Sequence, residues 1–293
     1  MKNKKTTVFL LLAVILLLLA ILIILIVSLV SSLRAKTSGH ENESENQADG
    51  TAGSVSQETG TESEPLPVTG EPDPVIDETP EFLSNLSEFE AYMNADDMRY
   101  LTLVNENHML DESYKPDDLI DVVDTRNDGR QTQKMAEAAE KALQAMFTEA
   151  RANGYTDLSV TSAYRSYSYQ KQLFDQYTQN EMENHPGISR EEAEKITSTY
   201  SARPGTSEHQ TGLCCDMHNL PSADVAFAKT EAAKWLSENC WKFGYILRYP
   251  SNKTEITGID FEPWHFRFVG RKHAKIIMSE GLCLEEYIQR IGG

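Results

Sequence analysis

The apolar run near the N-terminus constrains the fold of this chain most, because it separates a membrane-compatible segment from everything after it. Residues 8–30 are apolar apart from Ser28, and about 20 such residues are enough for a helix to cross a bilayer. Lysines precede the run at positions 2, 4 and 5, which predicts a cytoplasmic N-terminus and an exported C-terminus. We therefore expect residues 1–36 to form a cytoplasmic tip and a transmembrane anchor.

A cleaved signal peptide is the alternative interpretation of the same run. Signal peptides contain roughly 7–15 apolar residues before a small-residue cleavage site, whereas this run is longer and no clear cleavage site follows it. The anchor interpretation predicts a single-pass protein of the cell membrane, with the rest of the chain extracellular.

Residues 37–85 form a second segment, whose composition opposes folding. Between residues 37 and 90 the chain carries 14 acidic residues and no basic ones. Such a stretch cannot bury enough apolar surface to offset its ordering entropy, so we expect a disordered acidic linker over 37–85 and a folded domain over 86–293. The formal net charge of -18 argues against a nucleic-acid-binding protein, which needs basic surface.

The remaining residues mix helical and strand patterns, which predicts an α+β fold. Apolar residues recur at every third or fourth position over 131–152, a spacing typical of a helix with one buried face. Other helices are expected over 169–182, 190–199, 223–240 and 271–291, and strands over 100–104, 158–162, 211–217, 244–247 and 264–269. We expect one monomeric domain in which helices flank a small and mainly antiparallel sheet.

Two clusters of residues supply candidate chemistry. The first, residues 207–216, reads SEHQTGLCCD and contains His209 and Asp216; the second, residues 262–265, reads EPWH and ends on His265. Two imidazoles and one carboxylate suit a catalytic zinc ion, which uses three protein ligands and leaves a fourth position for water. Glu262, close to a ligand, suits a general base. Spacing alone is a weak signal, because histidines near unrelated acids on a surface give the same pattern.

These clusters belong to a longer series of motifs that resembles the VanY-type D-alanyl-D-alanine carboxypeptidases. That family comprises zinc peptidases that act on bacterial cell-wall stem peptides. The resemblance covers residues 100–288 approximately. The motifs, in chain order, are YRS with a glutamine four residues later (164–170), ARPGTSEH (202–209), GLCCD (212–216), GYILRYP (244–250) and EPWH (262–265).

The resemblance implies roles for individual residues. His209, Asp216 and His265 match the zinc ligands of the family, so the implied cofactor is Zn²⁺. Glu262 matches the catalytic base, and Arg165 matches the arginine that stabilises the oxyanion developing on the scissile carbonyl. Ser207 and Gln170 match positions that hold the end of the peptide.

The implied activity is removal of the terminal D-alanine from peptidoglycan stem peptides by the single catalytic domain. An L,D-carboxypeptidase or a D,D-endopeptidase acting on peptidoglycan would use the same residues, so the sequence leaves these alternatives open. A non-catalytic wall-binding module that keeps the metal is a third alternative. The presence of Glu262 and Arg165 beside all the predicted ligands favours an enzyme.

The cysteines at 214 and 215 depart from the family, which usually has small or aliphatic residues there. Side chains alternate along a strand, so Cys214 is expected to share a face with Asp216 while Cys215 faces away. A thiolate at Cys214 could compete for zinc, but we keep Asp216 as the ligand because the motif spacing is intact. An exported domain can form disulfides. Cys215–Cys240 is a candidate pairing, with Cys283 as the competing partner, and reduced, buried cysteines are the alternative.

Overall fold

A four-stranded antiparallel sheet forms the centre of this computed structural model, which describes residues 80–292. Its strands, in spatial order, are β3 (Ser159–Ser162), β4 (Cys214–His218), β6 (His265–Phe268) and β5 (Tyr245–Leu247). The two central strands pair so that Asp216 lies opposite His265 and Cys214 lies opposite Arg267. This pairing brings together the two chemical clusters, which are far apart in the sequence.

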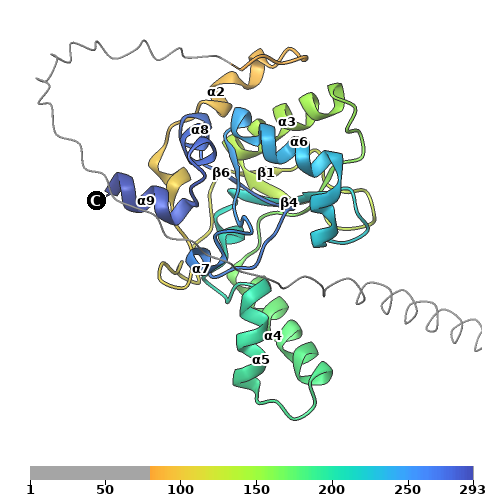
Figure 1. Cartoon of the computed structure of the whole chain (residues 1–293), viewed down its shortest axis with the longest axis vertical. Coiled ribbons are helices and arrows are strands. Elements are labelled where there is room, and N and C mark those ends of the chain that lie inside the picture. Colours follow the sequence, from red (N-terminus) through yellow and green to blue (C-terminus); the bar gives the residue numbers. More distant parts are fainter. Residues whose placement is uncertain (1–79, 293) are drawn as a thin grey trace, which may run out of the picture. The chain divides into compact units, whose positions relative to one another are not determined.

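A second, smaller sheet and several helices complete the described part of the chain (Figure 1). The second sheet pairs β1 (Leu119–Asp121) with β2 (Lys134–Ala136). The helices are α2 (Glu90–Met93), α3 (Glu137–Ala152), α4 (Tyr167–Asn184), α5 (Arg190–Tyr200), α6 (Glu231–Asn239), α7 (Thr254–Thr257), α8 (Arg271–Ser279) and α9 (Leu284–Gly292). Short 3₁₀ helices span Ser87–Phe89, Met98–Leu101, Glu208–Thr211, Val225–Lys229 and Cys240–Phe243. The predicted α+β architecture with small antiparallel sheets is confirmed.

Several predicted elements differ from the observed ones because tertiary contacts override the local pattern. The helix predicted from residue 131 begins only at Glu137, since residues 134–136 pair with β1 and Ala136 donates its N–H to the carbonyl of Gly212 at 2.9 Å. The strand predicted over 100–104 is replaced by the 3₁₀ helix Met98–Leu101. The helix predicted over 271–291 is divided into α8 and α9 around Gly281, which adopts a positive φ of 64°.

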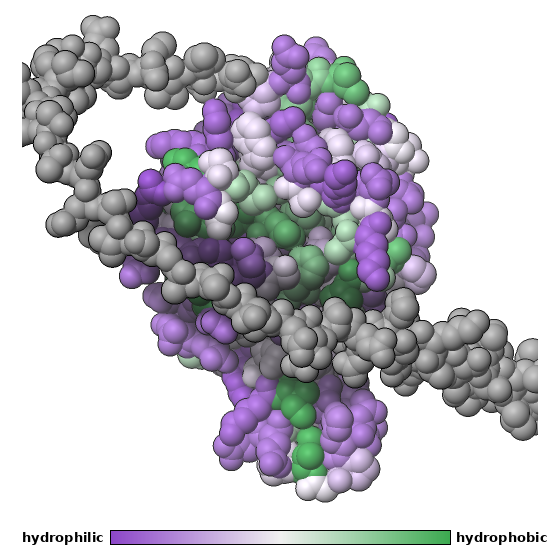
Figure 2. Space-filling view, viewed as in Figure 1, coloured by the Kyte–Doolittle hydropathy of each residue, from purple (hydrophilic) through white to green (hydrophobic). Residues whose placement is uncertain are grey.

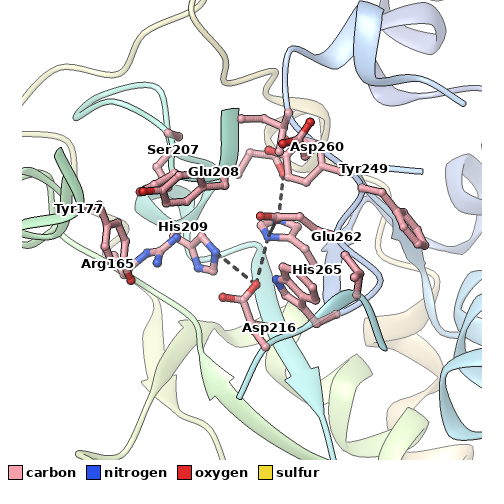
Figure 3. Close-up of a pocket in the computed structure, with 18 residues that line it drawn as sticks. Arg165, Tyr177, Ser207, Glu208, His209, Asp216, Tyr249, Asp260, Glu262 and His265 are labelled. Atoms are coloured by element: carbon pink, nitrogen blue, oxygen red, sulfur yellow. Dashed lines mark ion pairs between the residues drawn. The ribbon is translucent and has the colours of Figure 1, made fainter. Parts of the chain in front are cut away.

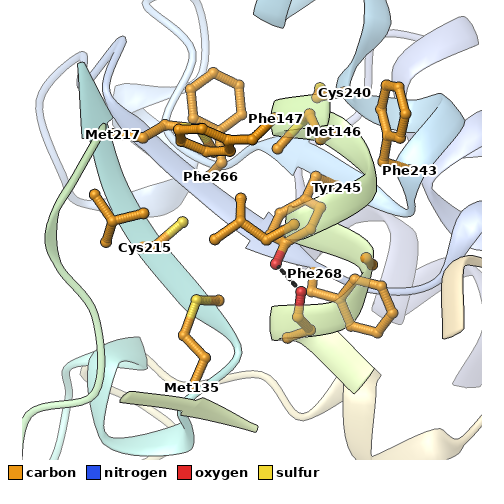
Figure 4. Close-up of a cluster of buried hydrophobic side chains, with 14 of the residues drawn as sticks. Met135, Met146, Phe147, Cys215, Met217, Cys240, Phe243, Tyr245, Phe266 and Phe268 are labelled. Atoms are coloured by element: carbon orange, nitrogen blue, oxygen red, sulfur yellow. Dashed lines mark hydrogen bonds between the residues drawn. The ribbon is translucent and has the colours of Figure 1, made fainter. Parts of the chain in front are cut away.

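One face of the four-stranded sheet packs into the main hydrophobic core (Figure 4). Cys215 and Met217 from β4 point into this core together with Phe266 from β6. The hydroxyl of Tyr245 in β5 donates a hydrogen bond of 2.6 Å to the carbonyl of Ala139, which ties the sheet to α3. Because side chains alternate along a strand, the core fixes the strands while Asp216 and His265 emerge on the opposite face.

The cysteine predictions have mixed outcomes. Cys215 faces the core and therefore points away from the candidate zinc ligands, as expected. The predicted Cys215–Cys240 bridge is wrong, because both thiols are free and buried, as are Cys214 and Cys283. Burial raises the pKa of Cys240 to about 12, so this side chain packs as a small apolar group rather than a reactive thiolate.

The folded part includes the last residues of the predicted linker. The backbone N–H groups of Leu83 and Ser84 donate to the carboxylate of Glu149 in α3 at 2.7 and 2.9 Å, and the ring of Phe82 lies 5.3 Å from that of Phe243. The predicted anchor and residues 37–79 of the predicted linker lie outside the described residues. Within residues 80–292, no helix is both long enough and apolar enough to cross a membrane.

Candidate active site

The two predicted histidine ligands, His209 and His265, converge on a carboxylate oxygen of the third predicted ligand, Asp216 (Figure 3). His209 lies in the 3₁₀ helix before β4, Asp216 lies within β4, and His265 is the first residue of β6. Oδ1 of Asp216 lies 3.6 Å from Nε2 of His209 and 3.1 Å from Nδ1 of His265. The pairing of β4 with β6 therefore creates the cluster that the sequence predicted from separate motifs.

These side chains fit a bound cation. Oδ1 of Asp216 is buried and has no hydrogen-bond partner among residues 80–292, and an unpartnered buried carboxylate oxygen is costly unless something compensates its charge. Nδ1 of His209 lies 2.6 Å from the carbonyl of Ala163, so its donation there leaves the Nε2 lone pair facing Asp216. Two imidazole nitrogens and one carboxylate oxygen match the donor set of a catalytic zinc site.

Cys214 is a second candidate ligand at the same place. Its sulfur and one nitrogen each from His209 and His265 all lie within 4.8 Å of one another. Burial opposes ionisation of the thiol, but the two neighbouring imidazoles lower its pKa to about 7. The structure therefore places a thiol and a carboxylate beside the same pair of histidines, where each could serve as the third ligand of a metal ion.

We expect Asp216 to be the third ligand. The Cys214→Ala variant should still bind one equivalent of zinc with nearly the wild-type affinity, because Asp216 remains on the same face of the strand beside the two histidines. Cobalt substitution provides the measurement, since a thiolate ligand to Co²⁺ gives an intense near-ultraviolet charge-transfer band and a carboxylate does not. A strong band in the wild-type protein that disappears in Cys214→Ala would contradict the assignment.

Glu262, the predicted base, lies beside the candidate ligands in a nearly dry position. Its Oε2 is 3.5 Å from Nδ1 of His265, and its side chain is only 13% exposed. Burial raises the pKa of Glu262 to about 7. A carboxyl group with a pKa near the working pH can both accept and return a proton efficiently.

The other predicted site residues divide into two groups. Arg165 and Ser207 line the same cavity as the candidate ligands, and Nε of Arg165 is buried without a hydrogen-bond partner among the described residues. Gln170 lies elsewhere: it is buried in α4 and donates from Nε2 to the carbonyl of Ala202 at 2.7 Å. Gln170 thus holds the segment that leads to Ser207, and this placement does not support direct contact with the peptide.

The cavity in front of the ligands has a volume of about 440 Å³. Its wall includes residues for which the sequence predicted no role, namely Tyr177, Tyr200, Tyr249 and Asp260. Tyr177 and Tyr200 come from the α4–α5 hairpin, whose visible surface is hydrophilic along both helices with apolar residues between them (Figure 2). Of these residues, Tyr249 belongs to the GYILRYP motif, so the sequence offered a signal for its place in the site.

A larger cleft of about 910 Å³ continues from this cavity, and both share Arg165, Tyr177 and Asp216 as lining residues. The cleft is lined by three further basic side chains, Arg126, Arg130 and Lys134. The combined space can hold an extended bound molecule that reaches past the candidate metal-binding residues on one side.

Known proteins are similar to this chain in both sequence and fold. The sequence profile of the family "VanY: D-alanyl-D-alanine carboxypeptidase" matches residues 132–271. The "Putative carboxypeptidase YodJ" of Bacillus subtilis (strain 168) is 39% identical over 196 residues, which cover 65% of this chain and 67% of that protein. The "D-alanyl-D-alanine carboxypeptidase" of Enterococcus faecalis is 41% identical over 146 residues, which cover 50% of this chain and 52%, about half, of that relative.

The bifunctional D-Ala-D-Ala dipeptidase and carboxypeptidase VanXYC of Enterococcus gallinarum is 32% identical, with 65% of this chain and 94% of that protein covered. Among solved structures, the LdcB LD-carboxypeptidase aligns with a TM-score of 0.56 at 38% identity, covering 64% of this chain and 84% of the other. A VanY D,D-pentapeptidase mutant in complex with Zn(II) aligns with a TM-score of 0.54 at 36% identity, covering 65% and 99%. The chain therefore belongs to the VanY family of D-alanyl-D-alanine carboxypeptidases.

Proposed function

We propose that this chain is a zinc-dependent D-alanyl-D-alanine carboxypeptidase that removes the terminal D-alanine from peptidoglycan stem peptides. The observation that carries the proposal is the convergence of His209, Asp216 and His265 beside Glu262, whose pKa is raised to about 7 by burial. A solved relative, VanYB, was determined in complex with D-alanine-D-alanine at 35% identity to this chain, which supports the substrate class.

The residues divide the chemistry between them. A zinc ion bound by His209, Asp216 and His265 would supply Lewis acidity toward the scissile carbonyl. Ionised Glu262 takes the proton of the attacking water and returns it to the departing amine, which requires the tunable carboxyl group seen here. The guanidinium of Arg165 faces the cavity and stabilises the negative charge that develops on the carbonyl oxygen.

Substitution of Arg165 tests its share of this work. Arg165→Ala should lower kcat/KM by about 10²–10³-fold, the cost of losing one oxyanion donor, while zinc content stays at one equivalent. Arg165→Lys should restore only part of the rate, because an ammonium group does not reproduce the fork of a guanidinium. Steady-state kinetics on a peptide ending in D-Ala-D-Ala, with metal analysis of each variant, measures both. Near wild-type kcat/KM in Arg165→Ala would refute the role.

An L,D-carboxypeptidase is the second candidate, favoured by the similarity to LdcB at 38% identity. Incubation of the purified full-length protein with pentapeptide, tetrapeptide and crosslinked muropeptides, followed by mass spectrometry, separates the candidates. The proposed activity shortens only the pentapeptide by one alanine. Shortening of the tetrapeptide indicates the L,D-enzyme, cleavage of the crosslink indicates an endopeptidase, and zinc binding without any product indicates a wall-binding module.

We further propose that the membrane anchors this enzyme and that its catalytic domain acts outside the cell. The apolar run over 8–30 and the preceding lysines support the anchor, and a peptidoglycan substrate requires an exported active site. Protease treatment of intact protoplasts should degrade the catalytic domain, and deletion of residues 1–36 should remove the protein from the membrane fraction. Full protection from protease would contradict this topology.

A further inference from the structure

Glu208 is a buried carboxylate directly behind the candidate ligand His265. It precedes His209 in the 3₁₀ helix Glu208–Thr211, and only 1% of its surface is exposed. Its Oε1 accepts hydrogen bonds from Nε of Arg248 at 2.7 Å and from Nη1 of Arg267 at 2.8 Å. Its Oε2 has no hydrogen-bond partner among residues 80–292 and lies 3.7 Å from Nε2 of His265.

His265 presents the complementary unpartnered atom. Its Nδ1 faces the cluster, 3.1 Å from Oδ1 of Asp216, and its Nε2 has no hydrogen bond within the described part of the chain. A neutral imidazole that offers the Nδ1 lone pair to a metal carries its proton on Nε2. Oε2 of Glu208 lies 3.7 Å from this Nε2, and a movement of about 1 Å or less brings the pair into hydrogen-bond range.

The network around Glu208 prevents its carboxylate from turning away. Arg248 also forms two hydrogen bonds with Glu285 in α9, at 2.9 and 2.6 Å. Arg267 donates to the carbonyls of Tyr100 and Thr102 at 3.0 and 2.8 Å. Two guanidinium groups thus face two carboxylates, so the buried charges are balanced, and the arginines hold Oε1 while Oε2 stays directed at His265.

We propose that Glu208 is a positioning residue that accepts the Nε2–H of His265 and thereby fixes the tautomer and ring orientation that present Nδ1 to the metal. Metal-binding histidines generally donate their second N–H to such a partner, and its loss typically costs 10–100-fold in metal affinity or activity. The inference rests on the proposed zinc ligation by His265. It assigns to Glu208 a role that acts through His265, without contact between the carboxylate and the metal.

The test substitutes Glu208→Gln in the full-length protein and measures zinc affinity by competition with a chromophoric chelator. Glutamine has nearly the same size, but when its oxygen faces the two arginines its NH₂ group faces the N–H of His265. Zinc affinity should therefore fall by about 10–100-fold. In ¹⁵N-histidine-labelled, zinc-loaded protein, the Nε2–H proton signal of His265 should also move upfield.

Glu285→Gln is the matched control, because it removes one negative charge from the same arginine network without facing His265. It should keep both the zinc affinity and the His265 proton signal. If Glu208→Gln fails to fold, Glu208→Asp replaces it, since the shorter side chain keeps the charge and withdraws the oxygen from His265. Equal zinc affinity in the Glu208 variant and the wild type, or equal losses in both network variants, would overturn the proposal.

These readouts do not depend on turnover, so the two proposals fail separately. A wild-type protein that binds no zinc at the histidine cluster would contradict both the proposed function and this inference. A wild-type protein that binds zinc and cleaves the peptide, with an unaffected Glu208→Gln variant, would contradict only the positioning role.

Discussion

Glu262→Gln should remove most of the turnover of this protein while leaving its zinc content unchanged. Glutamine keeps the size and hydrogen-bonding shape of the side chain but cannot accept the proton of the attacking water. A general base contributes about 10²–10⁴-fold to a rate, and the loss should reach at least this range because the same carboxyl group also returns the proton to the amine. Measurement of kcat on a D-Ala-D-Ala peptide, with zinc analysis, tests this expectation.

The same substitution should stabilise the metal-free protein at neutral and higher pH. Burial raises the pKa of Glu262 from its ordinary 4.5 to about 7. Between these values the folded state binds more protons than the unfolded state, so the contribution of Glu262 to the free energy of unfolding falls as the pH rises. The neutral glutamine escapes this loss, and the variant should gain up to about 3 kcal/mol above pH 7 and almost nothing near pH 4.

Urea unfolding in the presence of a chelator, at pH 5 and pH 8, measures the pH-dependent part. The difference between Glu262→Gln and the wild type should be small at pH 5 and large at pH 8. Equal stability of both proteins at pH 8 would show that Glu262 is not held in a desolvated site. Near wild-type turnover of the variant would contradict the assignment of the base itself.

The sequence predicted which candidate ligands lie together because each motif is local and the antiparallel pairing of β4 with β6 brings the motifs side by side. His209 and Asp216 are separated by only a short 3₁₀ helix and a turn, so one motif fixes both. The remaining step, which brings His265 opposite Asp216, follows from the antiparallel pairing of β4 with β6. The alternation of side chains along β4 likewise predicted the opposite orientations of Cys214 and Cys215.

Features that depend on distant partners were not predictable from local patterns. Glu208 belongs to the ARPGTSEH motif, but its proposed role depends on Arg248 and Arg267, which are 40 and 59 residues away in the sequence. Strand β2 was hidden because residues 134–136 continue the apolar spacing of α3, and only pairing with β1 makes them a strand. The disulfide prediction used chain proximity, whereas a bridge requires a specific approach of the two side chains.

Asp216→Ala should abolish specific zinc binding and, with it, the proposed activity. The substitution removes the one oxygen on which the two histidines converge, and the remaining imidazoles cannot hold the same geometry. The loss of affinity should exceed the 10–100-fold typical of losing an outer partner. Inductively coupled plasma analysis and chelator competition measure zinc content and affinity, and the peptide assay measures activity.

The zinc-dependent change in melting temperature tests the same prediction without an activity assay. A ligand that binds only the folded state stabilises it by about 4 kcal/mol at 1,000 times its Kd, so zinc should raise the melting temperature of the wild type and leave that of Asp216→Ala unchanged. Cys214→Ala is the matched control, because it removes the neighbouring candidate ligand on the same face of β4 and should still respond to zinc. The reverse pattern, with Asp216→Ala responding and Cys214→Ala not, would mean that the thiolate has replaced the carboxylate as the third ligand. Because both side chains could complete a zinc site with the same two histidines, this pair of variants decides between the carboxylate ligand implied by the family and a thiolate ligand particular to this chain.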